Sequence, residues 1–240
     1  METIENKQVA EYYDKLWKEL ESKNLGGINS RHRYILYHLK KAGLKKNSRI
    51  LEVGCGLGML TSFIGKSIPN GMITGVDISP ESIEFAKRKY GSANVHFEVN
   101  DMSNFSTDKK FDIVIFPDVL EHIPVESHNR IFSLVRNLLE PHSRIIIHIP
   151  NPAATAYMRI HHPEAMQIID LELHTDEFLK AMYSNGLFLE SLKSYSIFHN
   201  EPDYQLLILR QNLPYRTMTQ KSRISLLRRS LWLRLLNLIK

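Results

Sequence analysis

The chain has 240 residues, 43% of them hydrophobic, which is enough to bury the core of one domain with additions. No apolar run reaches the length of a transmembrane helix, and the amino terminus lacks the basic and apolar regions of a signal peptide, so we expect a cytoplasmic protein. The formal net charge is +5, but residues 211–240 carry seven cations and no acid. The rest of the chain therefore has a charge of −2, the difference between +5 and +7, which argues against a nucleic-acid cleft across the main domain.

The amino-terminal segment is predicted to form a helical cap. Apolar side chains at helical spacing predict amphipathic helices over 7–23 and 29–41. The run Tyr12-Tyr13-Asp14 in the first helix either covers a ligand or belongs to an ordinary buried helix face. The run Arg31-His32-Arg33 in the second helix either binds an anion or forms a solvated basic face.

A glycine-rich turn follows the first predicted strand. Residues 50–58 read Ile-Leu-Glu-Val-Gly-Cys-Gly-Leu-Gly, so an apolar strand runs directly into three glycines. Glycines remove side chains where the chain turns sharply into a helix and where a ligand needs backbone contact. Asp77 ends the next apolar run, nineteen positions after Gly58, where a carboxylate can accept hydrogen bonds from both hydroxyls of a ribose. The only cysteine, Cys55, is predicted to be a small spacer in this turn.

The glycine spacing distinguishes two nucleotide cofactors. The dinucleotide pattern G-x-G-x-x-G, counted from Gly54, needs a glycine at position 59, which is Met59. The segment 52–58 instead resembles the first motif of the class I S-adenosylmethionine-dependent methyltransferases, in which the bound anion is the methionine carboxylate. The resemblance implies S-adenosyl-L-methionine as the cofactor, bound in part by Glu52, Gly54, Cys55, Gly56, Gly58, Asp77 and Ile78.

The same resemblance extends over two further predicted strands. After strand 95–99, Asp101 and Met102 resemble the adenine-contacting acid of the family and its neighbour. After strand 111–116, residues 118–123 resemble the helix start of small-molecule members that act in ubiquinone and natural-product biosynthesis. Pro117 stands where relatives usually have a small polar residue, and the resemblance places it and Tyr13 at the cofactor.

Histidine is the usual group that takes a proton from a hydroxyl or phenol during methyl transfer. We predict His122, just beyond the fourth strand, as the first candidate base and His174, before a predicted helix at 175–185, as the second. Either histidine could instead cap or pack against its own helix. The pair His161-His162 predicts no metal site, because adjacent side chains on a strand point to opposite faces. The surrounding segment, 153–172, is predicted to be an irregular insertion that walls the acceptor pocket.

The carboxyl-terminal segment predicts a basic amphipathic helix within 221–239. Its apolar residues recur at helical spacing beside Trp232, and they are Ile224, Leu227, Leu231, Leu235 and Leu238. A basic helix with an apolar stripe suits a membrane interface or a lipid-linked substrate. Packing on its own domain or on a second copy in a homodimer fits the same stripe, whereas nucleic acid is the least favoured partner.

The alternation of strands and helices predicts a doubly wound, Rossmann-like α/β fold. Strands are expected at 49–53, 72–77, 95–99, 111–116 and 143–149, helices at 58–68, 80–90 and 125–139, and a final antiparallel pair at 187–197 and 203–210. Right-handed crossovers make the first five strands parallel. We therefore divide the chain into a cap (1–45), a methyltransferase domain (46–210) with the insertion 153–172, and a basic tail helix (211–240).

Three functions fit this arrangement. The leading one is O-methylation of a small molecule, such as a metabolite, sugar, phenol or lipid-linked intermediate. The alternatives are methylation of RNA or protein docked through the basic tail, and a cofactor-binding cyclase that does not methylate. Residues 116–119 read Phe-Pro-Asp-Val, which departs from the Asn- or Asp-Pro-Pro-aromatic signature of amino-methylating relatives.

Overall fold

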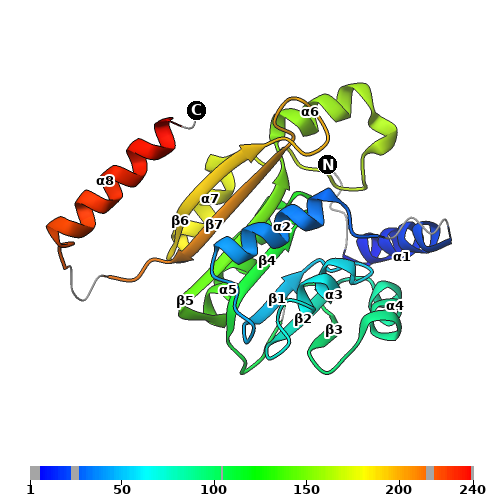
Figure 1. Cartoon of the computed structure of the whole chain (residues 1–240). Helices are drawn as coiled ribbons and strands as arrows, with labels where there is room; N and C mark the ends of the chain where they lie inside the picture. Colours follow the sequence, from blue (N-terminus) through cyan, green and yellow to red (C-terminus); the bar gives the residue numbers. More distant parts are fainter. Residues whose placement is uncertain (1–5, 23–26, 104, 215–218, 239–240) are drawn as a thin grey trace.

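The computed structural model describes residues 6–22, 27–103, 105–214 and 219–238. Its centre is a seven-stranded sheet with strand order β3-β2-β1-β4-β5-β7-β6 (Figure 1). The strands are β1 (Arg49–Val53), β2 (Met72–Asp77), β3 (Val95–Val99), β4 (Phe111–Pro117), β5 (Leu139–Pro150), β6 (Leu187–Tyr195) and β7 (Tyr204–Gln211). The α-helices are α1 (Asn6–Ser22), α2 (Ser30–Lys41), α3 (Met59–Gly65), α4 (Pro80–Tyr90), α5 (Val125–Leu138), α6 (Pro152–His161), α7 (Thr175–Ser184) and α8 (Arg223–Leu238).

The predicted doubly wound topology is confirmed. Strands β1 to β5 pair in parallel, and β7 pairs antiparallel with both β5 and β6. The strand order reverses between β1 and β4, which lie side by side although β2 and β3 separate them in the sequence. Ligands bind to sheets of this kind at the carboxyl ends of the strands beside such a reversal.

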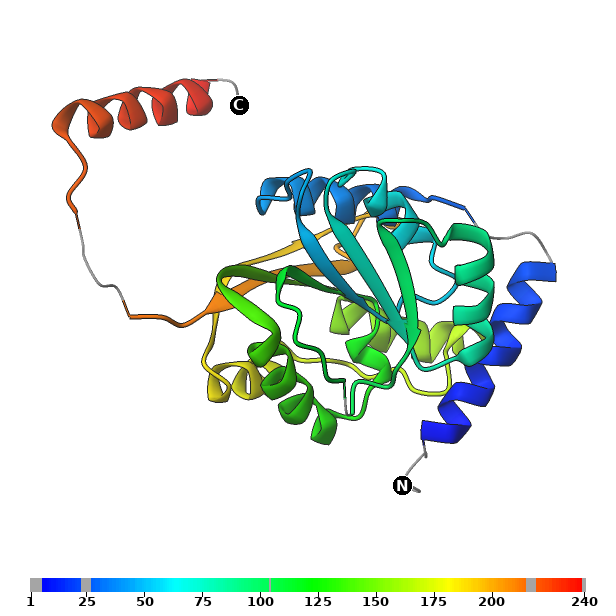
Figure 2. The same ribbon diagram turned by 90° about the horizontal axis from the view of Figure 1, so that it is seen from below.

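The side chains of the sheet alternate between its faces and build two hydrophobic cores. Ile113 and Ile115 of β4 pack with α2, α3 and α4, whereas Val114 and Phe116 pack with α5 and α7. Successive residues of a strand point to opposite faces, so β4 must be apolar at consecutive positions to be covered on both sides. Figures 1 and 2 show these helices on the two faces of the sheet.

The expectation of an irregular segment over 153–172 was wrong for its first half. Residues Pro152–His161 form helix α6, and a 3-10 turn, η2, follows at Pro163–Ala165. The Asn151 side chain accepts a hydrogen bond from the Ala153 amide at 3.0 Å, and Pro152 occupies the first turn. Asparagine before proline is therefore a helix start here. Proline has no backbone N–H, and in the first turn of a helix that N–H would have no partner within the helix.

The two terminal helices differ in how they meet the domain. Helix α1 lies beside α4, where the Ser79 hydroxyl donates to Asp14 and the Lys18 ammonium lies 3.1 Å from the Glu81 carboxylate. Helix α8 stands apart from the sheet in both views (Figures 1 and 2). Across the described residues, every helix is too short or too polar to cross a bilayer.

The glycine turn depends on backbone conformations that side chains disfavour. Gly54, Gly56 and Gly58 have φ values of +73°, +49° and +78°. A Cβ added to Gly58 would lie 2.6 Å from the Phe97 ring and 2.9 Å from Ala86 Cβ. Gly58 therefore joins β1 to α3 by allowing the turn and the close approach of the neighbouring core.

We predict that Gly58→Ala lowers the free energy of unfolding by roughly 2–4 kcal/mol, because it combines a left-handed backbone conformation with overpacking. Thermal or urea denaturation measures this change. Gly27→Ala is the matched control, since nothing lies within 4 Å of its added Cβ. Equal stability of the two variants would contradict the packing role of Gly58.

Candidate active site

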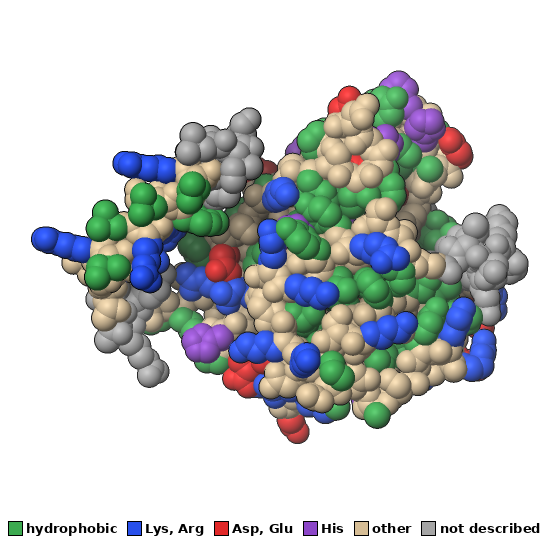
Figure 3. Space-filling view, in the orientation of Figure 1, with side chains coloured by type: hydrophobic (Ala, Val, Ile, Leu, Met, Phe, Trp, Pro, Cys, Tyr) green, Lys and Arg blue, Asp and Glu red, His purple; other side chains and the backbone are tan. Residues whose placement is uncertain are grey.

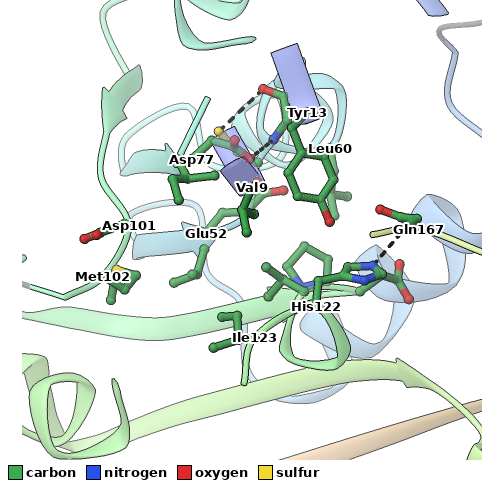
Figure 4. A pocket seen from close by; sticks show the side chains of 18 of the residues that line it. Val9, Tyr13, Glu52, Leu60, Asp77, Asp101, Met102, His122, Ile123 and Gln167 are labelled. Carbon is green, nitrogen blue, oxygen red and sulfur yellow. Dashed lines mark hydrogen bonds between the residues drawn. The ribbon is translucent and has the colours of Figure 1, made fainter. Parts of the chain in front are cut away.

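A cavity of about 590 Å³ opens at the carboxyl ends of β1, β2 and β4, next to the reversal of strand order. Its walls come from the glycine turn, from the loops after β2, β3 and β4, and from Val9, Tyr13 and Leu16 on one face of α1. Figure 4 shows Glu52 and Asp77 in one part of this cavity and His122 with Gln167 in another. This size suits a nucleoside-sized ligand together with a small second molecule.

The Asp77 carboxylate ties the glycine turn to the end of β2. Its Oδ2 accepts from the Gly56 amide at 2.8 Å, and its Oδ1 accepts from the Ser79 amide at 3.0 Å. Burial raises the pKa of Asp77. Each carboxylate oxygen can accept more than one hydrogen bond, so both retain capacity for donors in the cavity, such as ribose hydroxyls.

Glu52 is the clearest sign that the cavity takes a cationic or donor group. Its side chain is 1% exposed, and its Oε2 has no hydrogen-bond partner among the described residues. Burial raises the pKa of Glu52 to about 8. A buried polar atom without a partner is costly, and a ligand ammonium or hydroxyl at this wall would remove that cost. The residues present thus fit the amino-acid end of S-adenosylmethionine.

The loop after β3 adds a second constrained turn to the cavity wall. Met102 is a non-glycine residue with a φ of +61°, and its amide donates to Asn100 Oδ1 at 2.8 Å. The Asp101 carboxylate accepts from the Ser103 amide at 2.8 Å. Strained conformations of this kind persist where the surrounding structure holds them, and they cluster at binding sites.

The structure brings together ten of the eleven residues predicted to bind the cofactor. Those that line the cavity are Tyr13, Glu52, Gly54, Cys55, Gly56, Asp77, Ile78, Asp101, Met102 and Pro117. Gly58 does not line it and acts in the turn itself. Whether these residues bind the cofactor stays a prediction, but their placement agrees with it.

The two predicted catalytic histidines fall in different places. His122 ends the 3-10 helix η1 (Leu120–His122) and lines the cavity. His174 is the exposed residue before α7 and does not line the cavity. The geometry therefore supports a role at the site for His122 alone of these two.

His122 is held by the segment that follows η2. Its Nδ1 lies 2.6 Å from the Ile169 carbonyl oxygen and 3.0 Å from Asp170 Oδ1, and its Nε2 lies 3.2 Å from the Gln167 side-chain amide. Burial would lower the pKa of His122, but the hydrogen bond to Asp170 and the charge of Glu121 raise it to about 9. A histidine with this pKa is protonated at neutral pH and donates hydrogen bonds.

A half-buried charge cluster at the cavity wall was not predicted from the sequence. Asp118, with a φ of +55°, accepts from His148 Nδ1 at 2.7 Å and lies 3.1 Å from Arg31 Nη1. Burial would raise the pKa of Asp118, but the charges of His148 and Arg31 lower it below its usual value. The cluster joins α2, β5 and the loop after β4. Arg31 thus pairs internally and is not part of a solvated face, whereas Arg33 is exposed. Whether Arg31 also binds an anion stays a prediction.

We predict that His122 titrates with a pKa of about 9 in the free protein. The stability from its contact with Asp170 is then fully present below the ordinary histidine pKa and is lost as the pH rises through about 9. Histidine NMR signals followed against pH measure this value. Asp170→Asn should lower it by roughly one unit or more, because an opposite charge is removed.

The exposed acid Asp176 provides the control for this titration. Asp176→Asn removes the same charge from a helix start away from His122 and should leave the His122 pKa unchanged. A value near 6.5 in the unmodified protein would show that the contact with Asp170 is not formed in solution.

Residues 44–202 match the family described as Methyltransferase domain. Malonyl-acyl-carrier-protein O-methyltransferase 1 of Ilyobacter polytropus is 39% identical over 99 residues, which are 41% of this chain and 36% of that protein. The ubiquinone biosynthesis O-methyltransferase of Coxiella burnetii is 28% identical over 116 residues, which are 47% of this chain and 48% of that protein. This chain thus spans less than half the length of either relative.

Solved structures show the same fold at lower sequence identity. The magnesium protoporphyrin IX methyltransferase of Synechocystis with bound SAH has a TM-score of 0.68 against this chain and is 18% identical to it. The likeness covers 86% of this chain and 100% of that chain.

Proposed function

The chain belongs to the class I S-adenosylmethionine-dependent methyltransferases, and we propose that it methylates an ionised oxygen of a small acidic molecule. The observation that carries this proposal is that Glu52, Asp77 and His122 line one and the same cavity. Both parts of a transfer reaction, donor and acceptor, can then meet in one enclosed space.

The nature of the acceptor follows from the state of His122. Its Nδ1 donates to the Ile169 carbonyl oxygen, so a free base nitrogen could exist only at Nε2. With a pKa of about 9, Nε2 also carries a proton at neutral pH. His122 therefore suits an acceptor oxygen that arrives already ionised, such as a carboxylate or an acidic phenol. Nε2 would bind that oxygen as a donor in place of the Gln167 side-chain amide, which lies 3.2 Å away in the free protein. The named relatives support this class, because a malonyl group carries a free carboxylate.

The side chains of the cavity bind, orient and shield the reactants. The cofactor supplies an electrophilic methyl group on a sulfonium. Glu52 and Asp77 would hold its polar groups. Gly54 lets the glycine turn lie close to the loop after β4, since a Cβ there would lie 2.5 Å from the Val119 side chain. Tyr13 of α1 covers the cavity and limits the access of water. His122 would hold the acceptor oxygen in the same cavity.

Removing the Asp77 carboxylate should weaken cofactor binding. We expect Asp77→Ala to weaken the affinity for S-adenosylmethionine by roughly 1.5–3 kcal/mol, the range for lost charge-assisted hydrogen bonds. Isothermal titration calorimetry measures it, with circular dichroism as the check on folding. Asp108→Ala, which changes an exposed loop acid, should bind normally. Equal affinity in all three proteins would remove Asp77 from the site, and tight binding of NAD would overturn the cofactor.

A panel of acceptors tests the reaction itself. Alkyl and aryl carboxylates and phenols, each beside its amide or ether analogue, are incubated with labelled cofactor and the protein. We expect label in ionisable acceptors and none in the matched neutral analogues. Label found only in protein or RNA from a fractionated lysate would favour the macromolecular alternative.

With an acceptor identified, His122→Ala should lower kcat/KM by roughly 10²–10³-fold and leave cofactor affinity nearly unchanged, as the loss of an oxyanion donor does. The pH profile of the unmodified enzyme should be flat up to about 9 and fall above it, where His122 loses its proton. A profile that rises toward 9 would instead identify His122 as a general base. His174→Ala is the control and should react at full speed.

A further inference from the structure

Helix α8 exposes a large hydrophobic surface that the proposed reaction does not use. The exposed fractions of its large apolar side chains run from 48% to 66%, and the side chains are Ile224, Leu226, Leu227, Leu231, Trp232 and Leu235. Leu238, predicted in the same stripe, lies at the end of α8, and its side chain is outside the described residues. Packing on its own domain would bury such side chains, so the structure gives no support to that interpretation. Side chains this apolar need a partner.

The apolar and basic side chains of α8 are arranged along its length. Ile224, Leu227, Leu231 and Leu235 fall within an arc of about 80° at 100° per residue, and we call these four the apolar stripe. Arg228 and Arg234 border the stripe on opposite edges, and Trp232 lies just beyond Arg228. Leu226 lies off the stripe. Figure 3 shows hydrophobic and basic side chains next to one another on this helix.

The positive charge of α8 limits which partners could cover the apolar stripe. The described residues 219–238 contain five cations, Lys221, Arg223, Arg228, Arg229 and Arg234, and no acid. Two α8 helices packed stripe to stripe would bring their arginines together without any carboxylate to pair with them. Exposed Phe188 on β6 is a second candidate surface, but the Arg210 guanidinium lies 5.0 Å from its ring centre, so that surface is also basic. Nucleic acid would match the arginines and leave the leucines exposed.

We propose that α8 docks on the surface of an anionic lipid bilayer, with the apolar stripe in the boundary between headgroups and acyl chains. Its 16 residues are about 24 Å long, too short to span a bilayer and long enough to lie along its surface. The bordering arginines then reach lipid phosphates, and Trp232 lies at the level of the headgroups. The proposal does not depend on the methyl acceptor, because no described residue of α8 lines the cavity and α8 lies apart from the sheet (Figure 1).

Vesicle sedimentation with the full chain tests this docking. The probes are vesicles of phosphatidylcholine alone and of phosphatidylcholine mixed equally with phosphatidylglycerol, at about 0.05 M and about 0.5 M salt. We expect pelleting with the anionic vesicles at low salt, much less at high salt, and none with neutral vesicles. In Trp17→Phe, which leaves Trp232 as the only tryptophan, fluorescence should shift to the blue on binding.

Two variants separate the stripe from the cations. Leu231→Gln with Leu235→Gln should abolish pelleting without adding charge. Arg228→Glu with Arg229→Glu should reduce the partition coefficient for anionic vesicles by at least about tenfold. Lys45→Glu with Lys46→Glu makes the same change of charge at exposed residues before β1 and should bind far more strongly than the α8 charge variant. Because these side chains are exposed, thermal unfolding should be unchanged throughout.

Several outcomes would overturn the proposal. The first is that the intact chain stays in the supernatant with anionic vesicles at low salt. The second is that the double glutamine variant pellets as well as the unmodified protein. A dimer in analytical ultracentrifugation that the glutamine variant dissociates, without any vesicle binding, would assign the stripe to a second copy. RNA binding by both the unmodified protein and the double glutamine variant, again without vesicle binding, would assign the helix to nucleic acid.

Discussion

The position of the Asp77 carboxylate is the constraint on which the cavity depends. Its two oxygens accept from the amides of Gly56 and Ser79, so one side chain holds the turn after β1 against the turn after β2. The Val76 carbonyl adds to this by accepting from the amides of Gly54 and Cys55 at 2.8 and 3.0 Å. A short carboxylate at the end of a parallel strand can do this because the amides of both turns converge at the same edge of the sheet.

The opposite wall of the cavity depends on charges that neutralise one another. Asp118 connects His148 of β5 and Arg31 of α2, and His122 connects the loop after β4 to Asp170. A buried charge is tolerated when it is paired and hydrogen-bonded. Removing one partner of such a pair leaves the remaining charge without compensation for its lost hydration. This wall thus connects α2, β5 and the segment after η2 through paired charges. Its histidine is held as a hydrogen-bond donor, which accords with an acceptor that is ionised before it binds.

The sequence could predict those parts of the protein that depend on residues close together in the chain. The parallel strands follow from consecutive apolar residues, as in β4, and the glycine turn follows from φ values that only glycine adopts readily. Asp77 and Asp101 follow directly from the ends of β2 and β3, so their places in the cavity were predictable as well. Helix α6 was missed, although the signals of its start, the cap Asn151 and Pro152 in the first turn, are also local.

By itself, then, the sequence determined the succession of strands and helices along the chain, the glycine turn and the residues after β1 and β2 that line the cavity, since hydrophobic pattern and backbone sterics act over a few residues. The tertiary structure alone decided that His122 meets Ile169, forty-seven residues away, and that Asp118 meets His148 and Arg31. It also decided that His174 lies outside the cavity and that the apolar side chains of α8 that the structure describes are exposed. These outcomes depend on which side chains converge in space, and the pKa of a buried group depends on those neighbours rather than on its own position in the chain.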